Sequence, residues 1–372
     1  MYKLNLDIQS FLANDWQQAP KVYKGAFPEF ADPIAADELA GLACEDEVSS
    51  RVVVTKGEDW DVISGPFEDY DQFGEQGWQL LVQAVNHWYP DAQPLVEAFR
   101  FLPDWRFDDL MVSFATPKGG VGPHIDNYDV FIIQGEGRRR WTVGPKGNYN
   151  RRGGNPTSML IEDFEPIIDV VLEKGDVLYI PPGFPHQGET LTLALSYSMG
   201  FRAPSQQELA GQIADQLMDE DKGHKRFIAA EGAASKGLVS VAEQQGIMQL
   251  IRELCDDSDT VAKLLGKLLS QNRFDLDIQE DESMDEAELQ AALDEGALLS
   301  RIGGLKVLRM EGDSEPRLFI AGEGYVIAGA TDEELSQVAD DVTVSADIAL
   351  QPHWQRFFAD MLKKGYFYLA EA

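Results

Sequence analysis

Cysteine is scarce in this sequence, whose 372 residues contain only Cys44 and Cys255. Two cysteines so far apart cannot form a disulfide framework, so a reducing compartment is expected. No run approaches eighteen consecutive apolar residues, which excludes a membrane-spanning helix. The first eighteen residues include Asp7 and Asp15 and have no apolar stretch long enough for a secretory signal. We therefore expect a cytoplasmic protein with no membrane partner.

Basic residues are also under-represented, with 31 Lys and Arg against 64 Asp and Glu, and the net charge is −33. An acidic surface repels nucleic acid and membranes and attracts basic proteins. Acidity can equally serve solubility or reflect a saline habitat. The charge therefore argues against direct nucleic-acid binding and agrees with a basic protein partner. The apolar content of 44% and the aromatic content of 10% indicate a globular chain with two or three domains.

Histidine is rare as well, and two of the five histidines lie in segments that predict a metal site. His124 and Asp126 stand at i and i+2, so in a strand their side chains project from one face. His186 follows a turn at Gly175–Asp176, a buried strand at 177–180 and a rigid corner at 181–183. Two imidazoles and one carboxylate on one face of an octahedron are typical of non-haem Fe(II) oxygenases. A structural zinc site would be closed and richer in cysteine.

Each half of this pattern has an ordinary alternative. His124 could be a loop histidine near an unrelated carboxylate, since aspartate is common here. His186 could be a core histidine at the start of a strand. The stiff corner before His186 lowers the entropic cost of chelation, and the two segments together favour iron bound by His124, Asp126 and His186.

Three consecutive arginines, Arg138–Arg140, begin a strand after the Gly135–Gly137 turn. Such a cluster is often a solvated edge that discourages aggregation. Alternation, however, places Arg139 on the face opposite its two neighbours, so at least one arginine should point inward. A buried guanidinium needs an anionic partner. A dicarboxylate cosubstrate that chelates iron at one end would offer its other carboxylate to the planar fork of Arg139.

Residues from about 103 to 204 resemble the cupin-type JmjC domain of 2-oxoglutarate oxygenases. The similarity is greatest to bacterial ribosomal oxygenases in the run from Gly119 through His124 and Asp126 to Arg139, and it includes the segments 176–186 and 200–204. Members of that family hydroxylate an arginine side chain in a protein of the large ribosomal subunit. The resemblance implies Fe(II) as the metal, 2-oxoglutarate as the cosubstrate bound by Arg139, and dioxygen as the oxidant. Relatives often carry a hydroxyl residue beside the cosubstrate where this chain has Ala115, so the resemblance implies contact there through the backbone or through Ser113.

The same resemblance implies an α+β architecture in three parts. Residues 1–204 are expected to form a double-stranded β-helix (cupin or jelly-roll) JmjC domain, with the metal core at about 101–203. Residues 205–274 would form a helical dimerisation region, and residues 275–372 a winged-helix-like domain. The expected assembly is a homodimer that acts on a basic ribosomal protein.

Periodicity places most elements independently of this resemblance. Apolar residues at helical spacing predict a helix over 78–88, beside which His87 would be a packing residue. Strands are predicted at 110–115, 130–134, 139–143, 170–172, 177–180 and 192–199. Capping patterns and amphipathic stripes predict helices at 206–219, 237–254 and 259–271.

The last hundred residues begin with an acidic stretch, 275–288, that is expected to be a linker or a helix start. Ser283 would cap a helix reaching Asp294, and Thr331 another, while Pro352 would open the last, which runs to Leu362. Strands are predicted at 305–310, 318–321 and 325–327. This winged-helix-like order often binds DNA, but the acidic cluster favours a protein contact instead. His224 and His353 have no ligand partners nearby in sequence, so neither is expected to be functional.

Other functions would use the same metal site or part of it. The same iron centre could serve a demethylase or a hydroxylase of histidine or asparagine. A non-catalytic adaptor that only binds metal would not need the full set of ligands, and a cupin isomerase would not need Arg139. The favoured hypothesis is an Fe(II)- and 2-oxoglutarate-dependent protein arginine hydroxylase.

Overall fold

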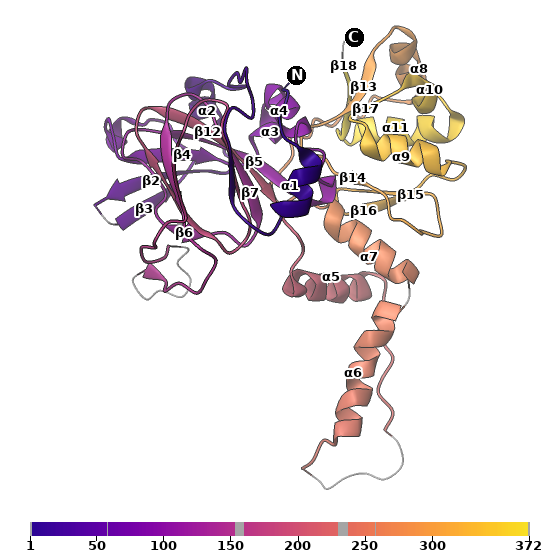
Figure 1. Ribbon diagram of the computed structural model, residues 1–372. Helices are drawn as coiled ribbons and strands as arrows, with labels where there is room; N and C mark the ends of the chain where they lie inside the picture. Colours follow the sequence, from indigo (N-terminus) through magenta and orange to yellow (C-terminus); the bar gives the residue numbers. More distant parts are fainter. Residues whose placement is uncertain (1, 58, 153–159, 230–236, 257, 371–372) are drawn as a thin grey trace. The chain divides into compact units, whose positions relative to one another are not determined.

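The structure is a computed structural model that describes residues 2–57, 59–152, 160–229, 237–256 and 258–370 (Figure 1). The chain divides into two compact units. The first comprises Met1–Ala203 with Asn272–Asp277, and the second comprises Pro204–Gln271 with Ile278–Ala372. The three-part division at residues 204 and 274 stays a prediction, and each unit is described below by itself.

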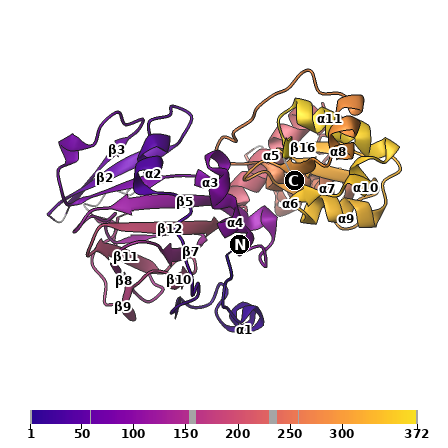
Figure 2. The ribbon, with the colours of Figure 1, turned by 90° about the horizontal axis from the view of Figure 1, so that it is seen from above.

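Two antiparallel sheets form the centre of the first unit (Figures 1 and 2). The described part of the larger sheet has eight strands, in the spatial order β1 (Lys21–Tyr23), β10 (Val177–Ile180), β7 (Asp129–Gln134), β12 (Ala194–Phe201), β5 (Phe107–Ala115), β4 (Trp78–Val82), β2 (Ser50–Lys56) and β3 (Asp59–Ser64). The smaller sheet has the order β6 (His124–Ile125), β11 (Pro185–Thr190), β8 (Arg139–Val143) and β9 (Ile168–Leu172). This arrangement agrees with the expected double-stranded β-helix.

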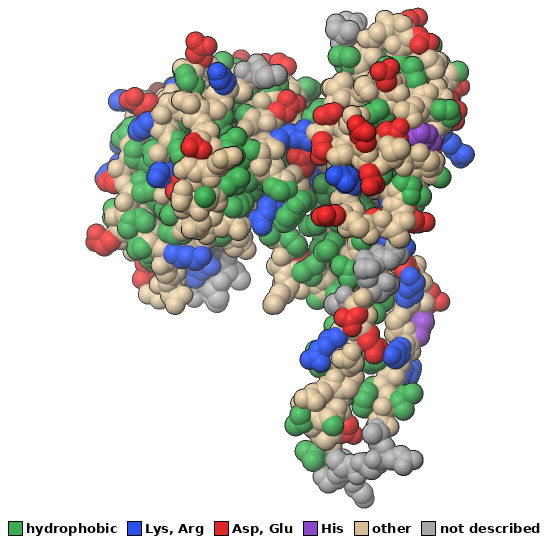
Figure 3. Space-filling view, turned by 45° about the vertical axis from the view of Figure 1, so that its right-hand side comes forward, with side chains coloured by type: hydrophobic (Ala, Val, Ile, Leu, Met, Phe, Trp, Pro, Cys, Tyr) green, Lys and Arg blue, Asp and Glu red, His purple; other side chains and the backbone are tan. Residues whose placement is uncertain are grey.

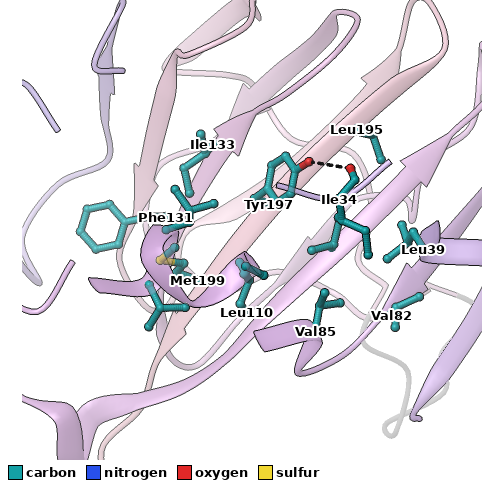
Figure 4. Packing of buried hydrophobic residues seen from close by; sticks show 14 of the residues in the cluster. Ile34, Leu39, Val82, Val85, Leu110, Phe131, Ile133, Leu195, Tyr197 and Met199 are labelled. Atoms are coloured by element: carbon teal, nitrogen blue, oxygen red, sulfur yellow. Dashed lines mark hydrogen bonds between the residues drawn. The ribbon is translucent and has the colours of Figure 1, made fainter. Parts of the chain in front are cut away.

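Strict alternation along the strands of the larger sheet separates two environments. One set of side chains belongs to a large apolar core that includes Leu110, Phe131, Ile133, Tyr197 and Met199 (Figure 4). Each fully buried side chain of this kind contributes about 1.5–3 kcal/mol to folding. The neighbouring residues on the same strands point to the other face, toward the smaller sheet. The larger sheet therefore supplies both the core and one wall of an internal space.

Helices of the N-terminal hundred residues contribute to that apolar core. Phe11 of α1 and Leu39 of α2 are almost fully buried, and Tyr197 donates a 3.5 Å hydrogen bond from its hydroxyl to the carbonyl oxygen of Ile34 (Figure 4). The helical elements of this region are α1 (Ile8–Asn14), α2 (Ala36–Leu42), η1 (Asp71–Phe73), α3 (Val85–Trp88), η2 (Pro90–Ala92), α4 (Gln93–Glu97) and η3 (Asp104–Arg106).

The helix predicted over 78–88 is wrong. Trp78–Val82 is strand β4, and only Val85–Trp88 is helical, after Ala84 adopts a left-handed backbone with φ 51°. Every residue of β4 is buried, because its two faces meet the apolar core and the internal space. A strand buried on both faces has no polar alternation, so its apolar residues imitated helical spacing. His87 is buried and packs as predicted, with Nδ1 2.8 Å from the carbonyl oxygen of Asp275.

The remaining strand predictions of the first unit are confirmed with shifted ends, but the sequence analysis gave no bounds for β11, the strand that carries His186. His186 lies inside β11 and not merely after a corner. Proline at its first position and glycine in its middle concealed it, since both residues are depleted in strands.

The second unit contains three helices before its small sheets. These helices are α5 (Gln206–Asp219), α6 (Val241–Asp256) and α7 (Ser258–Ser270), which confirms the three predicted helices to within a few residues. Ser205 caps α5 through a reciprocal pair of bonds with Glu208, as the sequence predicted.

Short helices and two three-stranded sheets complete the described residues of this unit. The helices are α8 (Glu286–Asp294), α9 (Asp332–Asp340), α10 (Ala346–Ala349) and α11 (Pro352–Lys363). The sheets have the orders β17 (Thr343–Val344), β13 (Leu298–Arg301), β18 (Phe367–Ala370) and β14 (Val307–Leu308), β15 (Arg317–Ile320), β16 (Glu323–Val326).

Two details of this region correct the sequence analysis. Asp285 caps α8 in a box with Glu288, whereas Ser283 bonds to Asp281 outside the helix. The strand predicted over 305–310 is reduced to Val307–Leu308. The predicted cap at Thr331 and the last helix from Pro352 are confirmed. Among the described residues, no helix has the length and apolar character needed to cross a membrane.

Candidate active site

A cavity of about 530 Å³ lies between the two sheets of the first unit. The larger sheet lines it with alternate residues of several strands, such as 79 and 81 of β4 and 109, 111 and 113 of β5. The smaller sheet contributes His124, Arg139, Trp141 and His186. Because the cavity collects inward-facing side chains from strands far apart in sequence, it gathers nearly all the residues that the sequence analysis had selected.

Strand pairing brings the two histidines of the predicted metal site together. His124 on β6 is directly opposite His186 on β11 in the antiparallel register, and their ring centroids are 4.2 Å apart. The corner before β11 is tied to the first motif, since the N–H of Gly183 donates a 2.9 Å bond to the carbonyl oxygen of Asp126. Gly183 has φ +88°, a conformation that favours glycine.

Asp126 completes the cluster. Its Oδ2 lies 3.6 Å from Nε2 of His186 and 3.9 Å from Nε2 of His124. An ion about 2.0–2.2 Å from each ligand atom requires those atoms to lie within about 4.4 Å of one another. Both carboxylate–imidazole distances meet this limit. Within the described chain, these three residues are the one group of histidine, cysteine or acidic side chains close enough to share an ion.

The backbone selects the ring nitrogen that each histidine presents. Nδ1 of His124 is 2.9 Å from the carbonyl oxygen of Gly122, and Nδ1 of His186 is 3.1 Å from that of Phe184. Since a carbonyl oxygen only accepts, each Nδ1 carries the proton and leaves the lone pair of Nε2 toward the cluster. Burial, reinforced by His124, lowers the pKa of His186 to about 4, so this ring is neutral near pH 7. The donor set fits an open, octahedral Fe(II) centre.

Arg139 lies in the same cavity as a buried cation without an anion. Its side chain is 2% exposed, and Nη2 donates to Oε1 of Gln79 at 3.0 Å and to the carbonyl oxygen of Gly188 at 3.4 Å. Both partners are neutral, and Nε of Arg139 has no hydrogen-bond partner among the described residues. Burial lowers the pKa of Arg139 to about 10. Such a group is costly unless a ligand supplies the negative charge.

The neighbouring arginine shows the opposite environment, as strand alternation predicted. Arg140 is exposed and forms a bidentate pair with Asp169 of β9, with bonds of 2.8 and 2.6 Å. Of these two arginines, only Arg139 lines the cavity. The alternation argument therefore distinguished the inward arginine from its neighbour on the surface.

The two tentative cosubstrate residues have different positions. Ser113 is buried on β5 and lines the cavity. Ala115 faces the same side but is fully buried between Gln79 and Ala194 of the adjacent strands and is not part of the cavity wall. The expected contact at Ala115 was through the backbone or through Ser113, and the cosubstrate roles of both residues stay predictions.

Three cavity residues escaped the sequence analysis or were only suspected. Gln79 orients Arg139 but lay in the segment taken for a helix. Asp109 is a buried carboxylate on β5 that has no motif around it, and the only signal for Tyr128 is its place two residues after Asp126. His224 and His353 do not line this cavity, and the expectation that neither is functional stays a prediction.

Comparisons with known proteins agree with this geometry. The JmjC domain model matches residues 94–209, and the ROXA-like winged helix model matches residues 253–368. The ribosomal protein uL16 3-hydroxylase of Escherichia coli strain K12 is 42% identical over 374 residues, which cover 99% of each chain. A probable ribosomal oxygenase of Haemophilus influenzae is 32% identical over 84% of this chain and 80% of its own.

Solved structures lead to the same group. YcfD, a ribosomal oxygenase from Escherichia coli in complex with cobalt and 2-oxoglutarate, has a TM-score of 0.91 at 41% identity, with all of both chains covered. The expected fold class, a JmjC core with a winged-helix-like domain, is thereby confirmed. Full-length identity of this extent, together with both domain matches, shows that the chain belongs to the JmjC-domain ribosomal oxygenases.

Proposed function

We propose that this protein is an Fe(II)- and 2-oxoglutarate-dependent oxygenase that hydroxylates an arginine side chain of a large-subunit ribosomal protein. One observation carries the proposal: the cluster of His124, Asp126 and His186 shares a cavity with the unpaired guanidinium of Arg139. The first group suits an iron ion and the second a dicarboxylate, which are the two requirements of this class of oxygenase. The relatives are named as ribosomal protein hydroxylases and oxygenases.

Different residues of the cavity would bind the metal and the cosubstrate. Bound iron with 2-oxoglutarate and dioxygen supplies the oxidising chemistry, in which one oxygen atom enters a C–H bond and the other enters succinate with release of carbon dioxide. His124, Asp126 and His186 would hold the metal on one side. Arg139, oriented by Gln79, would hold the distal carboxylate of the cosubstrate. The two sheets would exclude water and keep the substrate carbon near the reacting atoms.

The cavity also offers a place for a cationic substrate side chain. Asp109 and Asp126 are the carboxylates among its lining residues, and Asp126 belongs to the metal cluster. Oδ2 of Asp109 accepts a 3.1 Å bond from the N–H of Ala84, while Tyr128 lines the same space. A buried carboxylate beside an aromatic ring suits a guanidinium, which pairs with carboxylates and stacks on rings. We therefore assign the arginine specificity to Asp109 and Tyr128.

This assignment predicts a pH dependence. Burial, reinforced by Asp108, raises the pKa of Asp109 to about 7, although Arg273 and Arg51 oppose the shift. Only the ionised carboxylate pairs with a guanidinium, so the KM for the substrate should fall as pH rises from about 6 to about 8, approaching tenfold per unit below the pKa. In Asp109→Asn the KM should be high and independent of pH over this range, as steady-state kinetics would measure.

Stability provides a second measurement on the same variant. The native carboxyl, with its raised pKa, keeps its proton up to about pH 7, whereas the unfolded chain releases it near the ordinary aspartate pKa of 3.8. The native state therefore binds more protons between these values, and the contribution of Asp109 to stability is lost as pH rises through about 7. Ligand-free Asp109→Asn should consequently lose less stability than the wild type between pH 5 and pH 8. Parallel pH profiles for the two proteins would contradict the buried-carboxyl assignment.

Mass spectrometry tests the proposed reaction directly. The protein, Fe(II) and 2-oxoglutarate would be incubated with ribosomal proteins, and peptides would be searched for added oxygen. We expect one oxygen on an arginine of a large-subunit protein, with stoichiometric succinate. Oxygen on histidine or asparagine would overturn the arginine specificity, and loss of a methylene would indicate a demethylase. If the protein turns over no 2-oxoglutarate with any basic protein, the interpretation that remains is a non-catalytic adaptor.

The expected cytoplasmic location follows from a ribosomal substrate and stays a prediction.

We also propose that α6 takes part in a homodimer. Val241, Ile247, Met248 and Ile251 of this helix are each between 46% and 67% exposed, and Figure 3 shows hydrophobic side chains on this helical segment. The last three are spaced for one face of the helix, and contiguous exposed apolar surface marks protein contacts. A second copy of the chain is the expected partner.

The dimer is testable by mass in solution. Ile251→Glu places a charge in the apolar stripe and should convert the dimer into a monomer in sedimentation experiments. Gln249→Glu adds the same charge to the same helix outside the stripe and should leave the mass unchanged. A wild-type protein that sediments as a monomer would refute the proposal.

A further inference from the structure

Strand β3 is one of the two edge strands in the described part of the larger sheet, and it lies at the mouth of the candidate active site. It pairs with β2 on one side, and none of the described strands pairs with its other side (Figure 2). Trp60 and Val62 of β3 nevertheless line the cavity that contains His124, Asp126 and His186. Val62 is 62% exposed, so the strand is open to solvent where it meets the cavity.

The hydrogen-bond pattern shows which residues of β3 have free backbone groups. The N–H of Thr55 on β2 donates to the carbonyl oxygen of Gly77 on the side of β4, and the N–H of Gly65 donates to the carbonyl oxygen of Ser50. Antiparallel pairs alternate between bonded and non-bonded. Asp61 and Ile63 therefore bond to β2, while the N–H and C=O groups of Trp60, Val62 and Ser64 point outward.

The same alternation links the free edge to the cavity. Trp60 and Val62 present outward backbone groups and also direct their side chains to the cavity face. A strand added to this edge would continue the larger sheet, and its side chains would alternate between solvent and that face. One side chain in two would thus be delivered toward the metal cluster. Extended backbone is the form of substrate that this edge can bind.

Charge identifies the occupant. Asp59 and Asp61 project from the opposite face of β3, where Lys56 of β2 pairs with Asp61, and the whole chain carries a net charge of −33. An acidic edge strand disfavours pairing with a second copy of itself, since like charges would meet. It favours a basic segment, and ribosomal proteins are basic.

We propose that β3 is a docking strand: an extended, basic segment of the ribosomal substrate adds to its free edge through Trp60, Val62 and Ser64, and the target side chain enters the cavity from that added strand. This inference rests on the proposed hydroxylase function and specifies how the substrate is recognised.

A proline at position 62 tests the free edge. Val62→Pro removes an N–H that does not bond to β2, and the matched variant Val62→Ala shortens the side chain but keeps the N–H. Peptides spanning the hydroxylated residue found by mass spectrometry would serve as substrates. We expect the KM of Val62→Pro to exceed that of Val62→Ala by about 5- to 10-fold, as for the loss of one or two backbone hydrogen bonds, with similar kcat. Equal KM values would overturn the proposal.

Substrate peptides provide a test that needs no variant of the protein. Methylating one backbone nitrogen at a time should raise the KM at every second position, because alternate residues of an added strand bond to the edge. Uniform effects, or none, would overturn strand addition. If the wild-type protein hydroxylates no peptide at all, the proposed function itself fails, and this outcome is visible before any comparison of positions.

Discussion

Replacing Asp126 by alanine should abolish hydroxylation and metal binding together. The variant keeps both imidazoles but loses the carboxylate that lies 3.6 and 3.9 Å from their Nε2 atoms. Mutation of a residue that only hydrogen-bonds to a metal ligand lowers metal affinity or activity about 10–100-fold. Loss of the ligand itself should therefore lower the metal affinity by more than about 100-fold. Titration with Fe(II) or Mn(II) would measure the affinity, and mass spectrometry of the ribosomal substrate would measure the activity.

A surface carboxylate provides the control for this experiment. Asp169→Ala removes the exposed ion pair with Arg140, and such fully solvated pairs contribute little to stability. Its metal affinity and activity should match those of the wild type. Circular dichroism would establish that Asp126→Ala is folded. A folded Asp126→Ala protein that still binds iron and hydroxylates its substrate would refute the metal site.

Replacing Arg139 by methionine should have the second large effect, on the cosubstrate. Truncating one partner of a buried, hydrogen-bonded charge pair costs about 2–5 kcal/mol, which raises the Kd for 2-oxoglutarate by at least about 30-fold. The ligand-free variant should unfold at the same temperature as the wild type or a higher one, because the substitution removes a buried cation without an anionic partner. Calorimetric titration and thermal unfolding would measure the two quantities.

The adjacent residue is a matched control. Arg140→Met makes the same chemical change one position along β8, where the guanidinium is exposed and paired with Asp169. Its affinity for 2-oxoglutarate should be unchanged. Equal affinities of Arg139→Met and the wild type would remove the assigned role, as would a loss of affinity in Arg140→Met of similar size.

Local rules were sufficient for the features that depend on neighbouring residues. The i, i+2 spacing of His124 and Asp126, the inward direction of Arg139 and the caps at Ser205 and Thr331 follow from strand alternation and from side-chain bonds within one turn. Such features need no knowledge of distant contacts. The helix predicted over 78–88 failed for the converse reason, since β4 is buried on both sides and its state is determined by the sheet around it.

The sequence by itself determined which side chains suit iron and which arginine faces inward, and its acidity agrees with a basic partner. Only the tertiary structure decided what these groups meet. The register of β6 against β11 placed His124 opposite His186, β4 brought Gln79 to Arg139, and β5 brought Asp109 into the cavity. Cross-strand neighbours are separated by tens of residues in the chain, and their pairing depends on burial of the whole sheet, which no local pattern encodes.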